Sequence, residues 1–201
     1  MTEDAIEHIK KSVSIKPLNS GGSNFKTNVL VEKQKGVLQY IPSTGLLAFL
    51  SIFLMVGISF LVFGVYKVFF SNEYHFDFGH VIFAIVSFVF LSVSTAMAYQ
   101  NYKPNVFNKL TGRYTKGFVK NKIKKKSIDI SLSKIIALQL IGEIVPTDKG
   151  SYNSFELNIV LDDGERFNVV DHGNLKTLIA DAEWLSEFLN KPIWHAKSSK
   201  K

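Results

Sequence analysis

Residues 46–65 read LLAFLSIFLMVGISFLVFGV, twenty positions without a charged side chain. A second apolar run, residues 78–99, reads FGHVIFAIVSFVFLSVSTAMAY and has one ionisable interior group, His80, near its start. The hydrocarbon core of a bilayer is about 30 Å thick, and a helix needs roughly 20 residues to cross it. Two buried core helices are the alternative, which the length and pairing of the runs disfavour. The predicted elements are transmembrane helices over residues 45–66 and 78–100 and a connecting loop over residues 67–77.

Basic residues flank the two predicted helices unequally. The connecting loop has one lysine, Lys67, beside Glu73 and Asp77. Cytoplasmic flanks of membrane helices are enriched in lysine and arginine. We therefore expect a multi-pass protein of the bacterial cytoplasmic (inner) membrane with both termini cytoplasmic. Because some 45 mostly polar residues precede the first helix, we expect it to stay as an anchor and not to be a cleaved signal peptide. The basic residues after the second helix are Lys103, Lys109, Arg113, Lys116 and Lys120.

Small residues recur seven positions apart on both helices. Gly57 and Gly64 share one stripe of the first helix, and Ser87 and Ser94 share one stripe of the second. Small side chains let helix backbones approach closely in a membrane. The two helices are therefore predicted to pack against each other. Neither has a mid-membrane charge or proline of the kind that ion and substrate paths use, which disfavours a channel or transporter.

The segment over residues 103–195 is predicted to form one cytoplasmic domain of about five antiparallel strands and a C-terminal helix. Its sharpest signal is SFELNIVLDDGERFNVVD, residues 154–171. A three-residue loop over Asp162–Gly164, with Gly164 left-handed, would pair Ile159 with Phe167 and Leu157 with Val169. That register puts both apolar faces on the same side, whereas a two-residue turn would not. From Asn174, a predicted N-cap, the pattern becomes helical until Pro192 stops it.

The residues before the first membrane helix divide into two parts. Residues 1–22 are polar and are predicted to be a flexible tail. Residues 23–42 alternate like two strands, FKTNVLVE and GVLQYIP, and are predicted to form a cytoplasmic hairpin. Our hypothesis is that this hairpin completes the sheet of the C-terminal domain, so that the membrane helices are an insertion in a split domain. Residues 196–201 are predicted to be a basic tail.

This order of elements resembles bacterial pleckstrin-homology-like domains, which are seven-stranded rolls capped by a C-terminal helix. Two membrane helices followed by a domain that ends in A-x-x-L-x-x-F-L-x-x-P-I, here Ala182 to Ile193, are also similar to the photosystem I assembly factor family of chloroplasts and cyanobacteria. The resemblance covers most of residues 40–195 and implies a non-catalytic assembly or scaffold role without naming a partner. The fold class expected is an α+β membrane protein: a transmembrane hairpin plus a pleckstrin-homology-like antiparallel β-roll with a C-terminal amphipathic helix. The matching residues are Ile130–Ile135, Asp163-Gly164 and Phe188–Ile193.

A lysine run, KNKIKKK, begins at residue 120 and leads into the strand SIDISL. Nucleic-acid binding is disfavoured because no stacking aromatics are interleaved with the lysines. Binding to anionic lipid headgroups is one interpretation, since each lysine near the inner leaflet contributes on the order of 1 kcal/mol. A solvated loop whose charge only follows the membrane topology is an equally good interpretation. The strand is predicted to begin near Ser127, with the lysines in a solvent-facing loop. The candidate lipid- or partner-binding residues are Lys120, Lys122, Lys124, Lys125 and Lys126.

The sequence offers little chemistry for catalysis. It contains no cysteine and no phosphate-loop or catalytic-serine motif, so no cofactor and no metal are predicted. Glu73, His75, Asp77 and His80 have ligand chemistry, but a solvated loop is the favoured interpretation. Asp171-His172 would be a dyad only if both side chains pointed the same way, which neighbours in a strand do not.

The leading functional hypothesis is a non-catalytic membrane protein that binds membrane lipids and a protein partner, and a homo-oligomer is left open. The first alternative is a membrane immunity or regulatory protein that neutralises a toxin or membrane enzyme. The second alternative is an enzyme that uses Asp171 and His172.

Overall fold

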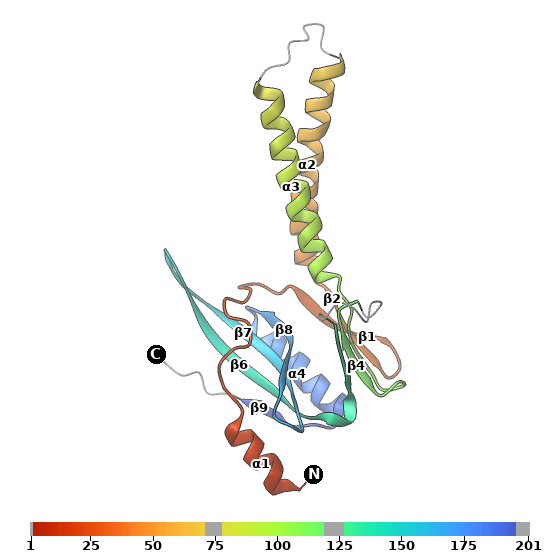
Figure 1. The fold of residues 1–201 in the computed structure, drawn as a ribbon, viewed down its shortest axis with the longest axis vertical. Helices are drawn as coiled ribbons and strands as arrows, with labels where there is room; N and C mark the ends of the chain where they lie inside the picture. The colour runs from red at the N-terminus through yellow and green to blue at the C-terminus, as the bar shows by residue number, and fades with distance from the viewer. Residues whose placement is uncertain (1, 71–77, 119–126, 196–201) are drawn as a thin grey trace. The chain divides into compact units, whose positions relative to one another are not determined.

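The computed structural model describes residues 2–70, 78–118 and 127–195. The chain is α+β and divides into two compact units (Figure 1). One unit spans residues 42–102 and consists of two long apolar helices. The other combines residues 1–41 with residues 103–201 and contains both β-sheets.

The helical unit consists of α2 (Thr44–Phe70) and α3 (Phe78–Asn101), each slightly longer than predicted. Both are long and apolar enough to cross a membrane. The predicted stripes of small residues lie at their interface. Ser87 Oγ donates to the carbonyl of Gly57 at 2.9 Å, and Ser94 Oγ donates to the carbonyl of Leu50 at 3.3 Å. A Cβ at Gly57 would lie 2.8 Å from Cγ of Leu91, so glycine is required for this close packing.

The first sheet, sheet A, combines strands that precede the helical unit in the sequence with strands that follow it. Its order is β1-β2-β3-β4-β5, and β2 pairs antiparallel with β3 through Leu38 and Phe107. The hairpin before α2 therefore pairs with strands that follow α3, as the split-domain hypothesis requires. The strands are β1 (Asn28–Gln34), β2 (Val37–Pro42), β3 (Asn105–Asn108), β4 (Arg113–Lys116) and β5 (Ile128–Ser131).

The second sheet, sheet B, has the order β8-β7-β6-β9, and β9 joins it parallel to β6. Helix α4 (Leu175–Leu189) is capped by Asn174, whose side chain accepts from the Thr177 amide, as predicted. A single roll was expected, but the structure has two sheets that are not closed. Strand β9 was not predicted. The elements of this sheet are β6 (Ile135–Thr147), β7 (Gly150–Leu161), β8 (Arg166–His172) and β9 (Ile193–His195), and η1 (Leu132–Lys134) leads into β6.

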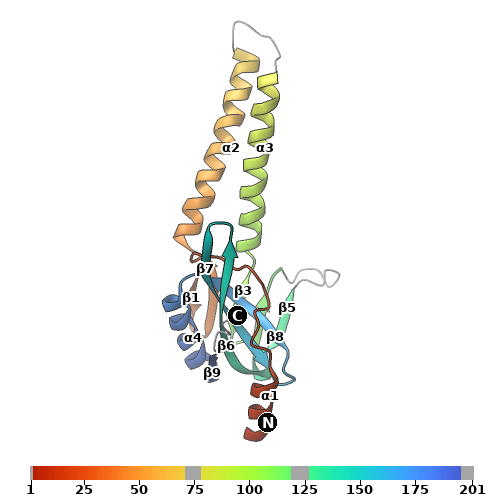
Figure 2. The same ribbon diagram turned by 90° about the vertical axis from the view of Figure 1, so that its left-hand side faces the viewer.

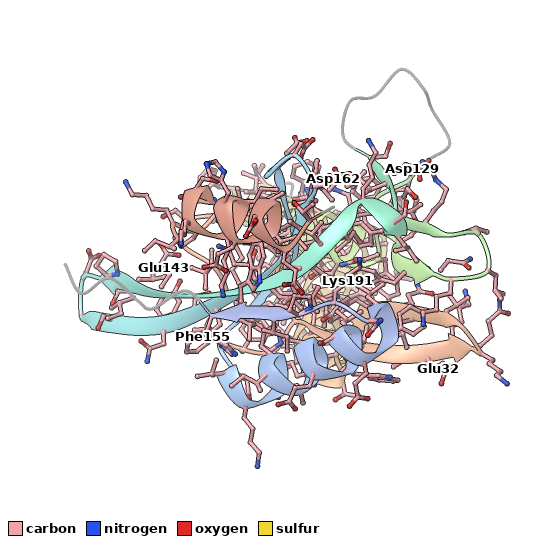
Figure 3. The ribbon with its side chains drawn as sticks, turned by 90° about the horizontal axis from the view of Figure 1, so that it is seen from below. Glu32, Asp129, Glu143, Phe155, Asp162 and Lys191 are labelled. Atoms are coloured by element: carbon pink, nitrogen blue, oxygen red, sulfur yellow. The ribbon has the colours of Figure 1, made fainter. Side chains whose placement is uncertain are left out.

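One face of sheet B contributes to the main hydrophobic core. Its apolar side chains pack with those of sheet A and of α4, and we call it the inner face. Leu157, Ile159 and Leu178 are completely buried there. Figure 3 shows Phe155 of β7 on the side of α4 and Glu143 of β6 on the opposite side. The sheet therefore has an apolar face and a second face that is mostly polar but also carries Ile141 and Val160.

The β7–β8 hairpin confirms the predicted loop and corrects the predicted register. Gly164 has φ 85°, and Ile159 pairs with Phe167, as expected for the three-residue loop. The expected pairing of Leu157 with Val169 is wrong, because Leu157 pairs with Val170 and Val169 is the extra residue of a β-bulge. The bulge is held from sheet A, where Asn105 Nδ2 donates to the Val169 carbonyl at 2.7 Å.

The N-terminal segment differs from the predicted flexible tail. Its first part is helix α1 (Glu3–Ser12), where Ile6, Ile9 and the following Val13 pack on an apolar patch that includes Val160 and Trp194. Residues 14–23, which we call the strap, then run along the second face of sheet B. In Figure 2 this segment leaves α1 and passes over β6 and β8. The sparse apolar spacing in α1 was the signal that the sequence prediction overlooked.

Candidate functional site

The five lysines predicted to bind lipid or a partner lie outside the described residues. They occupy residues 120–126, and the structure describes residues 2–70, 78–118 and 127–195. Lys116, at the end of β4, is described and lies in a polar network on sheet B. That network is the main concentration of buried polar side chains in the described β-sheet unit and is therefore the candidate site.

The polar face of sheet B is the face opposite α4. Three of its side chains are almost fully buried: Gln139 and Glu156 are 3% and 4% exposed, and Asn158 is completely buried. A buried glutamate is uncommon unless it is paired. The strap covers these side chains and supplies hydrogen-bond partners. The polar face consists of Gln139, Glu143, Glu156, Asn158, Arg166, Asn168 and Asp171.

Glu156 is the central contact of the strap. Its carboxylate accepts the backbone N–H groups of Leu18 and Asn19, each at 3.0 Å, and the side-chain amide of Asn158. Hydrogen bonds to an ionised acceptor are roughly twice as strong as neutral ones. One buried carboxylate therefore binds two successive amides of the strap, which bends at residues 18–21.

The first part of the strap is held by donors. Gln139 Nε2 donates to the carbonyl of Ser14 at 3.1 Å. The guanidinium of Arg166 donates to the carbonyl of Lys16 at 3.0 Å and to the side-chain oxygen of Gln139 at 3.1 Å. The carbonyl groups of the strap thus face amide and guanidinium donors on β6 and β8.

The last part of the strap lies close to the sheet. Glu143 accepts the Gly21 amide at 3.2 Å, and the Tyr152 hydroxyl donates to the Gly22 carbonyl at 2.8 Å. Ser154 Oγ donates to the Ser23 carbonyl at 3.3 Å. A Cβ on Gly22 would lie 2.3 Å from Ser154 Oγ, so only glycine fits at this approach without a shift of Ser154.

Beside the strap, Lys116 and Asp171 form the charged end of the polar face. Lys116 Nζ donates to the Asn168 carbonyl at 2.8 Å and to the Val169 carbonyl at 3.0 Å. Burial lowers the pKa of Lys116, although the charges of Asp171 and Glu156 partly offset this. Burial, followed by the charge of Glu156, raises the pKa of Asp171 to about 6. This carboxyl group therefore titrates close to neutral pH.

Asp171 and His172 point to opposite faces of β8. Asp171 accepts from Asn168 Nδ2 at 2.7 Å on the polar face. His172 is completely buried on the inner face, where its Nδ1 accepts from the Asn174 amide at 3.3 Å. Burial lowers the pKa of His172 to about 4, with a smaller effect of Lys26. The structure therefore does not bring these two side chains together as a dyad.

A second group of buried polar side chains lies in the core and was not predicted from the sequence. Tyr40 Oη, Asp181 Oδ2 and His172 Nε2 are buried without a hydrogen-bond partner among the described residues. Burial raises the pKa of Asp181 to about 6 and, with the charge of Asp181, raises the pKa of Tyr40. The helical period of α4 suggested only its apolar stripe, so Asp181 gave no signal.

The structure does not test the predicted absence of a metal site in the loop between α2 and α3, since Glu73, His75 and Asp77 lie outside the described residues. His80 is in the first turn of α3. Across residues 2–70, 78–118 and 127–195, the structure brings together no group of three or more His, Cys, Asp or Glu side chains that could hold a metal ion.

Comparisons with protein-family models, with curated proteins and with solved structures found no match to this chain.

Proposed function

We propose that this chain is an integral protein of the bacterial cytoplasmic membrane whose β-sheet unit is a non-catalytic binding module. The observation that carries the proposal is the exposed apolar surface of α2 and α3. Phe88, Val62 and Met55 are 73%, 60% and 59% exposed, although the small residues of both helices are used for packing within the pair. Exposure of so large an apolar surface to water would be unfavourable, whereas lipid would cover it.

The connection between the two units supports a membrane-presented module. A single residue, Ser43, separates β2 from α2, and three residues, 102–104, separate α3 from β3. Since β2 and β3 are paired, both ends of the helical pair are joined to one sheet. Antiparallel strands followed by a C-terminal helix are compatible with a pleckstrin-homology-like fold, which we keep as part of the proposal.

The module is proposed to bind protein partners or anionic lipid headgroups. The basic residues that follow α3 support a cytoplasmic position for both termini and attraction to an anionic leaflet. The separation of Asp171 from His172 removes the residue pair on which a catalytic reading was based.

Topology can be tested with single cysteines, because the chain has none. Ser71→Cys, between the helices, should react with a membrane-impermeant thiol reagent in intact cells. Ser133→Cys, in η1, should react only after permeabilisation. Labelling of Ser133→Cys in intact cells, or release of the protein from membranes by alkaline carbonate, would contradict the proposed topology.

Binding can be tested on the full chain purified in mild detergent. We expect a co-eluting protein, or retained phosphatidylglycerol detected by mass spectrometry. Serine at all five lysine positions from 120 to 126 should reduce the retained lipid, with Lys176→Ser in α4 as a control. A wild-type protein that retains neither protein nor anionic lipid would contradict the binding role.

A further inference from the structure

Most side chains on the polar face of sheet B are carboxylates, amides and a guanidinium, although Ile141, opposite Glu156, is also buried there at 3% exposed. Water solvates these polar groups well, and one face of an antiparallel sheet is commonly left to solvent. The strap also buries little of its own apolar surface, since Ile15 is 50% exposed and Leu18 is 42% exposed. Removing the strap would therefore expose mainly polar groups. The strap is held mainly by hydrogen bonds.

The polar face contacts the strap mainly through its backbone. Seven of the ten strap residues form a hydrogen bond to the sheet through a backbone group. Two strap residues contact it through side chains, Asn19 toward Asp171 and Ser20 toward Glu143. Recognition of this kind depends little on sequence, except at Gly21, whose φ of 80° favours glycine, and at Gly22, where a small residue is required. The backbone contacts involve Ser14, Lys16, Leu18, Asn19, Gly21, Gly22 and Ser23.

The strap is anchored at both ends by contacts of a different kind. Helix α1 packs on the apolar patch through Ile6, Ile9 and Val13. After the strap, the chain enters β1 of sheet A. The middle of the segment can therefore leave the polar face and return while both anchors stay in place.

We propose that the polar face of sheet B is a docking surface for a bent, glycine-containing segment of a partner protein, recognised through its backbone, and that the strap occupies this surface in cis. This inference rests on the proposed binding function and names the surface that performs it. The partner segment needs free backbone amides opposite Glu156 and Glu143 and a glycine opposite Ser154. Because the strap is tethered, its effective concentration is on the order of millimolar, so a partner binds only when it outcompetes the strap.

The test uses the full chain in mild detergent and a fluorescent peptide of residues 2–23 as the probe. Wild-type protein should bind this peptide weakly. A released variant, Ile9→Asp with Leu18→Pro, loses the α1 anchor and one of the two amides that donate to Glu156, but its polar face is unchanged. We expect the released variant to bind the peptide at least tenfold more tightly than wild type. A folded released variant, verified by circular dichroism, that does not bind the peptide would overturn the proposal. The milder variant Leu18→Pro serves the same test if the double variant does not fold.

Two further comparisons identify the surface and the mode of recognition. In the released variant, Glu156→Gln should weaken peptide binding about tenfold, whereas Glu183→Gln on α4 should leave it unchanged. A peptide with alanine at Ile15, Lys16 and Leu18 should bind within threefold of the native peptide, and a peptide with proline at Leu18 should bind at least tenfold more weakly. Loss of binding on alanine substitution would overturn backbone recognition. If the released variant binds the peptide but purified wild-type protein retains neither a partner protein nor anionic lipid, the proposed function is contradicted while the docking surface stands.

Discussion

Both faces of sheet B are buried at their centres but by different interactions. On the inner face, Leu157 and Ile159 are completely buried against the core below α4. On the polar face, Glu156 is 4% exposed because the strap lies over it and donates two amides to its carboxylate. The inner face loses apolar contact with water, which drives folding. The polar face exchanges hydrogen bonds with water for hydrogen bonds with the strap, which contributes little net free energy. Burial at the two centres therefore accompanies different roles, one in stability and the other, as we propose, in binding.

The largest expected difference between the faces comes from two matched leucines. Leu178→Ala in α4 removes a completely buried side chain and should lower the free energy of unfolding by about 2–5 kcal/mol. Leu18→Ala in the strap removes a side chain that is 42% exposed and should change it by about 0.5 kcal/mol or less. Urea titration followed by tryptophan fluorescence measures both, because the two tryptophans, Trp184 and Trp194, lie in the β-sheet unit. Equal losses would show that the strap is part of the core.

A smaller effect is expected where the chain passes from the strap toward β1. A Cβ on Gly173 would lie 2.2 Å from the carbonyl oxygen of Asn24, and backbone cannot move aside cheaply. Gly173→Ala should therefore cost about 1–3 kcal/mol and displace the N-terminal segment. Gly142→Ala in β6 is the matched control, since its Cβ would meet Phe155 at an ordinary 3.5 Å. Limited proteolysis within residues 14–27 should accelerate in the first variant only, and equal rates would contradict the close approach.

The smallest effect is a pH dependence in which Asp171 on the polar face and His172 on the inner face act with opposite sign. On the polar face, the pKa of Asp171 is raised from 3.8 to about 6. The folded protein then binds more protons than the unfolded chain between these values, so this group lowers stability as pH rises from about 4 to 6. On the inner face, the pKa of His172 is lowered from 6.5 to about 4, and this group raises stability over the same interval. Asp181, with a pKa of about 6, acts in the same direction as Asp171.

Substitution can separate these contributions. Stability of Asp171→Asn relative to wild type should increase as pH rises from 4 to 6, by roughly 1 kcal/mol per pH unit at most. Stability of His172→Gln relative to wild type should decrease over the same interval. Urea titrations at several pH values give both difference curves. A flat difference curve for Asp171→Asn would mean that this carboxyl group is not buried by the strap.

The sequence predicted features that depend on local pattern or chain length. The two apolar runs predicted α2 and α3. The seven-residue spacing of Gly57 and Gly64 and of Ser87 and Ser94 indicated where the two helices pack. The parity of apolar residues around Gly164 fixed the loop length of the β7–β8 hairpin. It did not reveal the bulge at Val169, because the bulge depends on Asn105 and Lys116, which come from the other sheet.

The candidate site was less accessible to prediction for a physical reason. Alternation along β7 placed Glu156 on a polar face but could not show that another segment covers it. The strap contributes mainly backbone groups, and every sequence has those. Its glycines suggested flexibility, whereas in the structure Gly22 permits close approach to Ser154.

Hydrogen exchange at the backbone amides tests most directly whether the strap is separable from the fold. The amides of Leu18 and Asn19 should exchange by local opening, with a free energy at least about 2 kcal/mol below that of the amides of Leu157 and Ile159 in β7. Glu156→Gln should accelerate the first pair and leave the second pair unchanged. If all four amides exchanged only by global unfolding, the strap would belong to the stable fold, and the polar face would not be a docking surface.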